Sequence, residues 1–230
     1  MPETIAHLKE SGNAFSLFIP PINRDWEKAL HLGAQKKYKE NELIMRGDKD
    51  CEHLMYVHSG RVRCEHPCLK GNLKVCFYAE GGSIIGEALA INDLPTVATF
   101  FASKDCIVYA FTIKTLQTEI IPKYPELAFN LMQTMAYKIR MYSLHLESIT
   151  LNDIHEQICR ICYSLLIETN ALEKKPGISQ QELADVLGVH RNTIVRAVKK
   201  LKEEGIISEL SRSVLRVNRL EDLLSDLSFK

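Results

Sequence analysis

Five basic side chains lie between Arg191 and Lys202 with no acid among them, in a chain whose formal net charge is zero. They belong to the stretch GVHRNTIVRAVKKLKEEGII, where apolar residues recur every three or four positions. That period predicts a helix with one packed face and one exposed, basic face. Between Lys174 and Arg216, nine Lys or Arg stand against five Asp or Glu, a balance of +4 (9 − 5). A local basic excess of this kind indicates a nucleic-acid partner.

A second helix is predicted just upstream, in ISQQELADVL. Ser179 is an N-cap type, and Glu182 three residues later completes a capping box. Gly188 leaves room only for a tight turn before the basic helix. After that helix, IISELSRSVLRV alternates as two short strands. This order of elements predicts a winged helix-turn-helix. The alternative is an arbitrary helix pair whose second member happens to be basic.

The recognition helix is expected at 190–203, with its N-terminal residues facing base edges. Arginine suits guanine and asparagine suits adenine, whereas lysines further along the helix suit phosphate. The residues expected to contact DNA are Ser179, Gln180, His190, Arg191, Asn192, Thr193, Arg196, Lys199, Lys200 and Arg212.

The chain has a different pattern before the helix pair. From about His31 to Thr112, glycines separate short apolar runs such as HLMYV, LKVCFYAE and CIVYAFT, which predict an antiparallel sandwich or barrel. After Pro122 the period becomes that of a heptad helix. Its apolar stripe consists of Ala128, Met132, Met135, Ile139, Tyr142, Leu146 and Ile149. We expect the stripe, from Met132 onward, to pair with its copy in a homodimer; the alternative is a helix that packs on its own barrel.

Asn152 and Asp153 interrupt the heptad pattern, and Asp153 can cap a new helix. The predicted fold is therefore α+β, with a β-barrel effector domain at 1–121, a dimerisation helix at 122–151 and a winged helix DNA-binding domain at 152–230. The first residues lack the pattern of a secretion signal, and no apolar run approaches the roughly 20 residues that span a bilayer. We expect a cytoplasmic protein with no membrane partner.

The combination of these parts resembles the bacterial transcription regulators related to the cyclic-AMP receptor protein and the fumarate and nitrate reduction regulator, the Crp/Fnr family. SQQELADVLGVHRNTIVRAVKKL is similar to the family's DNA-binding motif, and IIGEALA followed by LPTVAT is similar to its effector-cradling cassette. The resemblance covers nearly the whole chain. It implies a jelly-roll barrel, a homodimer on an inverted-repeat operator, a small-molecule effector and a function that is not enzymatic. It also allows contact with RNA polymerase.

The cassette departs from the family's nucleotide-binding pattern. Cyclic-nucleotide binders carry Pro-Arg-Ser or Pro-Arg-Thr, whereas Pro95 is followed here by Thr96 and Val97. A buried phosphate needs a cation, which threonine does not supply, so cyclic AMP and cyclic GMP are not expected. The resemblance places the effector among Gly86, Glu87, Ala88, Leu89, Thr96, Val97, Tyr137, Lys138, Tyr142 and Ser143.

Aromatic rings with one ammonium group suit a small aromatic anion. Relatives that control reductive dehalogenation sense chlorinated aromatic acids with such a pocket, and AYKIRMY loosely resembles them. The alternative for Lys138 is an ordinary exposed position on the long helix. The sequence does not identify the effector.

The chain has seven cysteines, an odd number that favours reduced thiols over a disulfide framework. Metal or redox sensing through cysteine is the alternative within the same fold. The oxygen-sensing relatives hold iron and sulfur near the N-terminus, but the first cysteine here is Cys51. Cys64 with Cys68 could bind a metal or oxidise together, yet their spacing matches no common site.

Two further cysteines, Cys159 and Cys162, are expected to pack inside a helix. The histidines at positions 53, 58 and 66 are expected to face solvent. We therefore expect no metal and no resident cofactor. A cupin-like metalloenzyme is a less favoured alternative, because HLMYVHSGRVRCEH lacks the His-x-His spacing of that chemistry.

Overall fold

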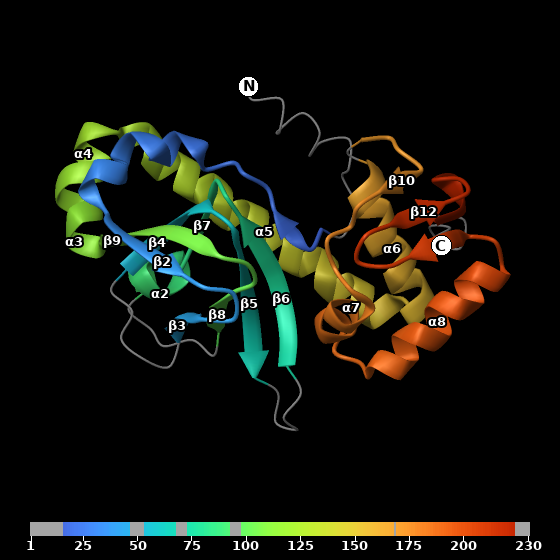
Figure 1. The fold of residues 1–230 in the computed structure, drawn as a ribbon. Coiled ribbons are helices and arrows are strands. Elements are labelled where there is room, and N and C mark those ends of the chain that lie inside the picture. Colours follow the sequence, from blue (N-terminus) through green and yellow to red (C-terminus); the bar gives the residue numbers. More distant parts are fainter. Residues whose placement is uncertain (1–15, 47–52, 68–72, 93–97, 168, 224–230) are drawn as a thin grey trace. The chain divides into compact units, whose positions relative to one another are not determined.

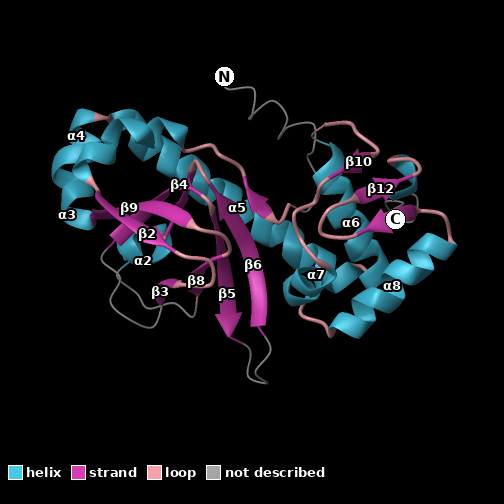
Figure 2. Ribbon diagram, viewed as in Figure 1, coloured by secondary structure: helices cyan, strands magenta, loops and turns pink. Residues whose placement is uncertain are grey.

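The computed structural model describes residues 16–46, 53–67, 73–92, 98–167 and 169–223. Two compact units divide the chain, and the boundary falls between Ile139 and Arg140. The first unit is Phe18–Ile139 and the second contains the residues from Arg140 onward. Figures 1 and 2 show sheets and short helices in the first unit, and helices with a small sheet in the second.

Two sheets form the body of the first unit, a five-stranded sheet of order β1-β6-β5-β8-β3 and a four-stranded sheet of order β2-β9-β4-β7. Among the described strands every pairing is antiparallel except β1 with β6. The predicted antiparallel β-domain is confirmed. The strands are β1 Phe18–Ile19, β2 Ala34–Tyr38, β3 Leu43–Arg46, β4 His53–Ser59, β5 Arg61–Pro67, β6 Leu73–Glu80, β7 Ser83–Ile85, β8 Thr99–Ala102 and β9 Cys106–Thr112.

Alternating burial explains why these runs are strands. In β9, Cys106, Val108 and Ala110 are buried, whereas the residues between them are half-buried. Gly60 joins β4 to β5 with a φ of 91°, where any Cβ would collide with the backbone oxygen of Asp105. The turn between these strands therefore requires glycine.

Short helices and the start of one long helix complete the first unit. They are the 3-10 helix η1 (Arg24–Leu32), α2 (Glu87–Asn92), α3 (Ile113–Thr115), η2 (Leu116–Ile120), α4 (Ile121–Lys123) and α5 (Pro125–Leu151). An apolar core joins η1, the four-stranded sheet and α5 through residues that include Trp26, Tyr56, Phe111 and Leu127, all fully buried.

A buried polar network fixes α5 to the same unit. Asn23 Nδ2 donates to Asn130 Oδ1 at 2.7 Å and to Thr134 Oγ1 at 2.6 Å. Trp26 Nε1 donates to Asn130 Oδ1 at 3.0 Å, and Asn130 Nδ2 donates to the Ile22 carbonyl at 2.7 Å. Because buried amides must be hydrogen-bonded, this network specifies how the start of α5 packs.

The second unit is a winged helix, as predicted. Its sheet has the order β10-β12-β11, and β11 pairs with β12 as the predicted hairpin. Among its described helices none has the length and apolarity needed to cross a membrane, and the same holds for the described helices of the first unit. The elements are α6 Ile154–Ile167, β10 Glu173–Lys174, α7 Gln180–Leu187, α8 Arg191–Glu203, β11 Ile207–Leu210, β12 Leu215–Val217 and the 3-10 helix η3 Glu221–Leu223.

A two-residue break separates α5 from α6, at the predicted place. Asp153 Oδ1 accepts hydrogen bonds from the backbone N–H groups of His155 at 2.7 Å and Glu156 at 3.0 Å. Glu156 Oε2 accepts in return from the Asp153 N–H at 2.7 Å. Asp153 therefore caps α6 with a reciprocal pair of bonds.

Candidate functional site

The helix-turn-helix begins with a complete capping box. Ser179 Oγ accepts from the Glu182 N–H at 3.2 Å, and Glu182 Oε2 accepts from the Ser179 N–H at 2.7 Å. α7 ends at Leu187 and is capped by Gly188, whose φ of 68° is the left-handed conformation that glycine adopts without strain. Cap and turn together fix where α8 starts.

The two faces of α8 differ sharply in burial. Ile194, Ala197, Val198 and Leu201 are buried. The predicted DNA contacts on this helix are all exposed, namely Arg191, Asn192, Thr193, Arg196, Lys199 and Lys200. Packing on one face thus holds the other open to solvent as a row of basic and amide side chains.

His190 is the N-cap of α8, and its Nδ1 accepts from the Asn192 N–H at 3.2 Å. Lys199 and Lys200 pair with Glu203 and Glu204, each at 3.6 Å. Such exposed pairs four residues apart contribute only about 0.3–0.5 kcal/mol. Both lysines can therefore exchange these partners for phosphate at little cost.

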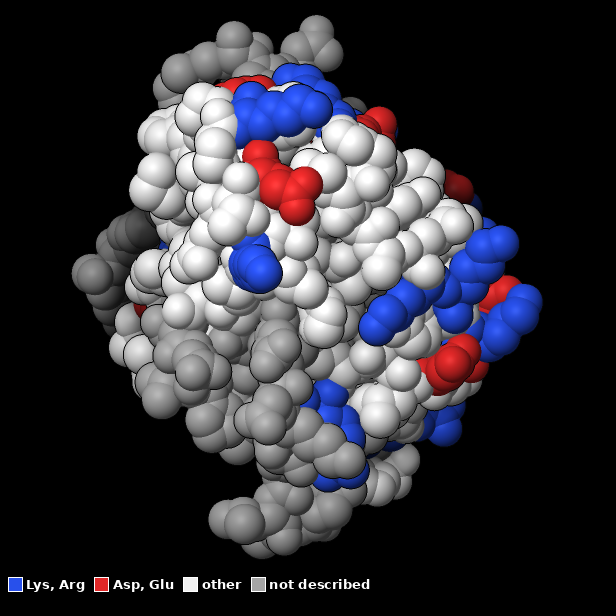
Figure 3. Space-filling model, turned by 90° about the vertical axis from the view of Figure 1, so that its left-hand side faces the viewer, with Lys and Arg blue, Asp and Glu red and all other residues white. Residues whose placement is uncertain are grey.

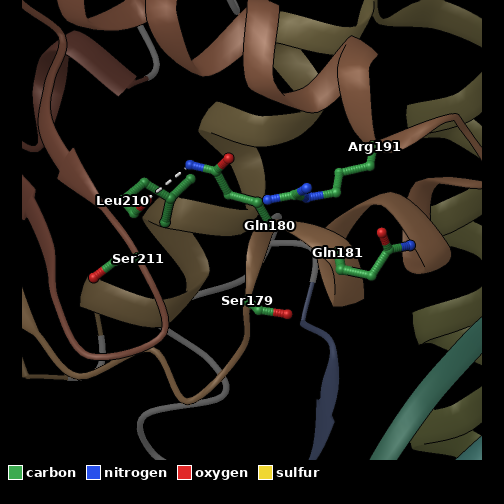
Figure 4. Close-up of a pocket in the computed structure, with 6 residues that line it drawn as sticks. All are labelled: Ser179, Gln180, Gln181, Arg191, Leu210 and Ser211. Atoms are coloured by element: carbon green, nitrogen blue, oxygen red, sulfur yellow. Dashed lines mark hydrogen bonds between the residues drawn. The ribbon is translucent and has the colours of Figure 1, made fainter.

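A hollow of about 470 Å³ lies between the starts of α7 and α8 and the strand β11. Figure 4 shows the Arg191 side chain reaching from α8 toward Gln180. Gln180 Nε2 donates to the Leu210 carbonyl at 3.0 Å, so this amide already ties α7 to the wing. Arg212 is exposed in the turn between β11 and β12. The hollow is lined by Ser179, Gln180, Gln181, Arg191, Leu210 and Ser211.

Charge elsewhere is more mixed. Figure 3 views the molecule from the left-hand side of Figure 1, where blue Lys and Arg side chains are interspersed with red Asp and Glu on a largely uncharged surface. From Arg191 to Lys202, by contrast, α8 carries no acid. The basic charge between Arg191 and Lys202 therefore lies on an exposed helix face.

The predicted effector residues divide into those the structure brings together and those it does not. Lys138 Nζ donates to Glu87 Oε1 at 2.7 Å and to the Ile84 carbonyl at 3.0 Å. Both charged side chains are buried, with 8% and 9% of their surface exposed. The ordinary exposed position weighed for Lys138 is therefore wrong, because the ammonium has buried acceptors from β7 and α2.

Surroundings of this ion pair are partly apolar. Lys138 Nζ lies 5.1 Å from the ring centroid of Phe77, and Glu87 Oε2 is buried without a hydrogen-bond partner among the described residues. Gly86 precedes α2 with a φ of 81°. The other residues of the predicted site are more scattered. Ala88 is exposed, Tyr137 is half-buried, and Tyr142 and Ser143 belong to the second unit. Thr96, Val97 and the side chain of Leu89 lie outside the described part of the structure.

The apolar stripe of α5 is largely exposed. Met132, Ile139 and Leu146 keep 57%, 69% and 65% of their surface, and Tyr142 and Ile149 are also exposed, whereas Met135 is half-buried. A different face of α5, containing Leu127, Leu131 and Thr134, is buried. Within the first unit, Met132 and Ile139 therefore lie off the face by which α5 packs on the sheets, and the pairing of the stripe with its copy stays a prediction.

Comparison with known families matches both parts of the chain. Residues 35–120 match the cyclic nucleotide-binding domain, and residues 159–225 match the Crp-like helix-turn-helix domain. The chain belongs to the Crp/Fnr family of transcription regulators. The family predicted from the sequence motifs is confirmed.

This Crp/Fnr regulator is 23% identical over 190 residues to the cAMP-activated global transcriptional regulator CRP of Salmonella typhimurium, a match covering 80% of the chain and 90% of CRP. Its fold is similar to that of a CooA mutant from Carboxydothermus hydrogenoformans, with a TM-score of 0.78, 17% identity, and 87% and 90% of the two chains covered. OCPA-complexed CprK is similar at a TM-score of 0.75 and 19% identity, over 94% and 98% of the two chains.

One cluster of the Crp/Fnr regulator was missed by sequence reasoning. The ligand atoms of Cys64, His66 and Cys76 all lie within 4.8 Å of one another. Sequence spacing suggested Cys68 as the partner of Cys64, but Cys68 lies outside the described residues and the structure brings Cys76 instead. Only the pairing of β5 with β6 reveals this neighbour. His66 is half-buried beside it, so this histidine faces solvent only in part.

The thiols of this cluster differ in character. A hydrogen bond with Cys76, followed by burial, raises the pKa of the Cys64 thiol. Hydrogen bonds from Cys64 and then from His66 outweigh burial and lower the pKa of Cys76 well below that of an ordinary thiol. In α6, by contrast, burial raises the pKa of Cys162, as expected for a thiol that only packs. Cys159 is buried in the same helix.

Proposed function

We propose that this protein is an effector-gated transcription regulator that binds an inverted-repeat operator as a homodimer. The observation that carries the proposal is the geometry of α8. One face is packed by Ile194, Val198 and Leu201, and the opposite face is exposed and basic at the start of a recognition helix in a winged helix fold. Recognition helices read base edges with their N-terminal residues, which here are His190, Arg191, Asn192 and Arg196.

The assembly follows from the exposed stripe of α5. Large apolar side chains on one helix face are stabilised when a second copy covers them, and a two-fold axis lets each stripe pair with itself. In the wider family of helix-turn-helix dimers, two recognition helices enter successive major grooves about 34–36 Å apart. The operator is therefore an inverted repeat.

The effector proposal starts from the buried pair of Lys138 and Glu87. A carboxylate effector would have to displace Glu87 as the partner of the ammonium, and its aromatic body would then lie beside the buried Phe77 ring. Cyclic AMP is not the effector we propose, because Thr96 and Val97 stand where a phosphate needs a cation. CRP relatives are named as cAMP-activated, so cyclic AMP is the competing ligand in every test.

Operator architecture is tested by selecting binding sites for the purified full-length protein from a random pool of DNA duplexes. Three selections run in parallel: one without ligand, one with OCPA, the compound in the CprK structure, and one with cyclic AMP. The expected product is an inverted repeat whose half-sites are one helical turn apart. A variant with Arg196→Ala serves as the matched control and should enrich a less defined site. Enrichment of a single half-site, or of no sequence, would contradict a dimeric recognition mode.

A further inference from the structure

Strands β5 and β6 bring three metal-binding side chains together in the five-stranded sheet. Cys64 and His66 are two residues apart on β5, and side chains at that spacing point to the same face of a strand. Cys64 pairs with Phe77 of β6, and the next residue, Glu65, pairs with Val75 of β6. Cys76, which lies between Phe77 and Val75, is therefore an extra residue at a bulge. Bulges redirect a side chain locally, and this one places the Cys76 thiol against the other two ligands.

The spacing of the ligand atoms suits one metal ion. Zinc binds cysteine sulfur at about 2.3 Å and histidine nitrogen at about 2.0–2.1 Å, which puts neighbouring tetrahedral ligands roughly 3.5–3.8 Å apart. The two thiol sulfurs and the imidazole nitrogen all lie within 4.8 Å of one another. Small side-chain rotations would bring the three ligand atoms to the separation that zinc requires.

The ligand types select the ion. Sulfur and imidazole favour zinc-like cations, whereas magnesium and calcium require oxygen ligands. Cys64 and Cys76 keep only 1% and 7% of their surface exposed, and two thiolates neutralise a divalent charge in such a buried place. The nearby ammonium of Lys138 is already neutralised by Glu87. Half-buried His66 leaves the rim of the site accessible for ion entry and for a water ligand.

From this geometry we propose that Cys64, His66 and Cys76 bind one divalent thiophilic cation of the zinc class, with an open fourth coordination position. The ion joins β5 to β6 by contacts that the backbone ladder does not supply. This site is independent of the proposed DNA-binding function, since it uses only residues of the first unit.

Metal binding is tested on the full-length protein, reduced under argon and freed of metal with a chelator. Zinc chloride is titrated by calorimetry, and cobalt(II) serves as a spectroscopic probe of the ligands. We expect one ion per chain and the near-ultraviolet absorption of thiolate bound to cobalt. Cys64→Ser and Cys76→Ser should each weaken zinc binding at least about tenfold, and His66→Gln should weaken it while retaining the thiolate absorption.

The matched control is Cys106→Ser. Cys106 is another buried thiol of the first unit, outside the cluster, and serine can still donate to the Arg61 carbonyl that the thiol contacts at 3.2 Å. This variant should bind zinc as the wild type does, and circular dichroism checks that every variant is folded.

Three results would overturn the proposal. They are an absence of zinc binding to the reduced wild type, binding that survives Cys76→Ser, and equal loss in the Cys106→Ser control. Formation of a Cys64–Cys76 disulfide by peroxide, in a protein that binds no zinc when reduced, would assign the pair to redox chemistry instead. Specific DNA binding by the same preparations is measured separately, so that either proposal can fail alone.

Discussion

The Lys138 ammonium is buried, and its acceptors are Glu87 Oε1 and the Ile84 carbonyl. Taking a charge out of water is costly, and a close opposite charge with good hydrogen-bond geometry offsets that cost. Either member of the pair therefore depends on the other. A period-based prediction could place Lys138 on a helix, but it could not show that the opposing residue is a carboxylate from a separate helix.

Removing one charge of the Lys138–Glu87 pair should destabilise the folded protein much more than removing both charges. Lys138→Met leaves the Glu87 carboxylate buried and unpaired, so the free energy of unfolding should fall by about 3–5 kcal/mol. Lys138→Met combined with Glu87→Gln should recover part of that loss. Denaturant unfolding followed by fluorescence of Trp26, the single tryptophan, reports on the unit that contains the pair. Lys114→Met is the control, expected to stay within about 0.5 kcal/mol of wild type. Equal losses in the single and double variants would argue against a coupled pair.

The N-cap of α6 has a pH-dependent effect. The hydrogen bond from the Glu156 N–H, followed by the one from His155, lowers the pKa of Asp153. Because the folded-state pKa lies below the unfolded one, this stabilisation is present at neutral pH and is lost as pH falls through the folded-state pKa. Asp153→Ala should cost about 1 kcal/mol at pH 7, and its difference from wild type should shrink as the pH falls through the lowered pKa of Asp153. A constant difference across that range, measured by thermal unfolding, would exclude a contribution from the charge.

Two single substitutions on α8 can separate sequence-specific base recognition from sequence-independent binding to phosphate. Arg196→Ala should weaken binding to the selected operator by about 1–3 kcal/mol and relax the base preference at one position, whereas Lys200→Ala should weaken binding to operator and unrelated DNA alike. Arg196 is near the start of the helix, where base edges are read, and Lys200 is one turn further along. Fluorescence anisotropy with both DNAs at one fixed salt concentration measures this. Equal loss on both DNAs for Arg196→Ala would assign that residue to phosphate.

At the scale of elements, sequence prediction succeeded where the signals are local. The capping box of Ser179 and Glu182 fixes α7, and the apolar period fixes α8, because neither depends on a distant partner. The two-residue strand β10 has no comparable local signal and is defined by its pairing with β12. The bulge at Cys76 is likewise a property of two paired strands. The metal ligands it brings together could not be read from spacing along one strand.

The α5 stripe predicts a dimer that a buried charge should disrupt. Ile139→Glu and Leu146→Glu would each place a carboxylate in the seam, opposite its own copy, and should shift the protein to monomers in sedimentation velocity. Gln133→Glu is the matched control, because it adds the same charge to α5 outside the stripe and should leave the dimer intact. Unchanged sedimentation of Ile139→Glu and Leu146→Glu would mean that another surface holds the copies together.

For the whole molecule, effector control requires two arrangements that bind the effector with different affinity. α5 carries Lys138 in the first unit and ends at the capped break of Asn152 and Asp153, where backbone angles can change between the two arrangements. An effector that displaces Glu87 from Lys138 acts on this helix directly. The coupling is reciprocal: bound DNA must raise the affinity for the effector by the same factor by which the effector raises the affinity for DNA.

If the effector is a small aromatic carboxylate held by Lys138, cyclic AMP at millimolar concentration should leave operator affinity unchanged and such a carboxylate should raise it. OCPA, the compound in the CprK structure, serves as the probe. Calorimetric titration of OCPA into free and operator-bound protein should give two dissociation constants whose ratio equals the gain in operator affinity. Lys138→Met should abolish the response to OCPA, and Glu87→Gln should strengthen OCPA binding, because the ammonium loses its charged competitor. Tight binding of cyclic AMP would show that the phosphate finds a cation elsewhere in the cassette. An OCPA response that survives Lys138→Met would move the effector site away from this ion pair.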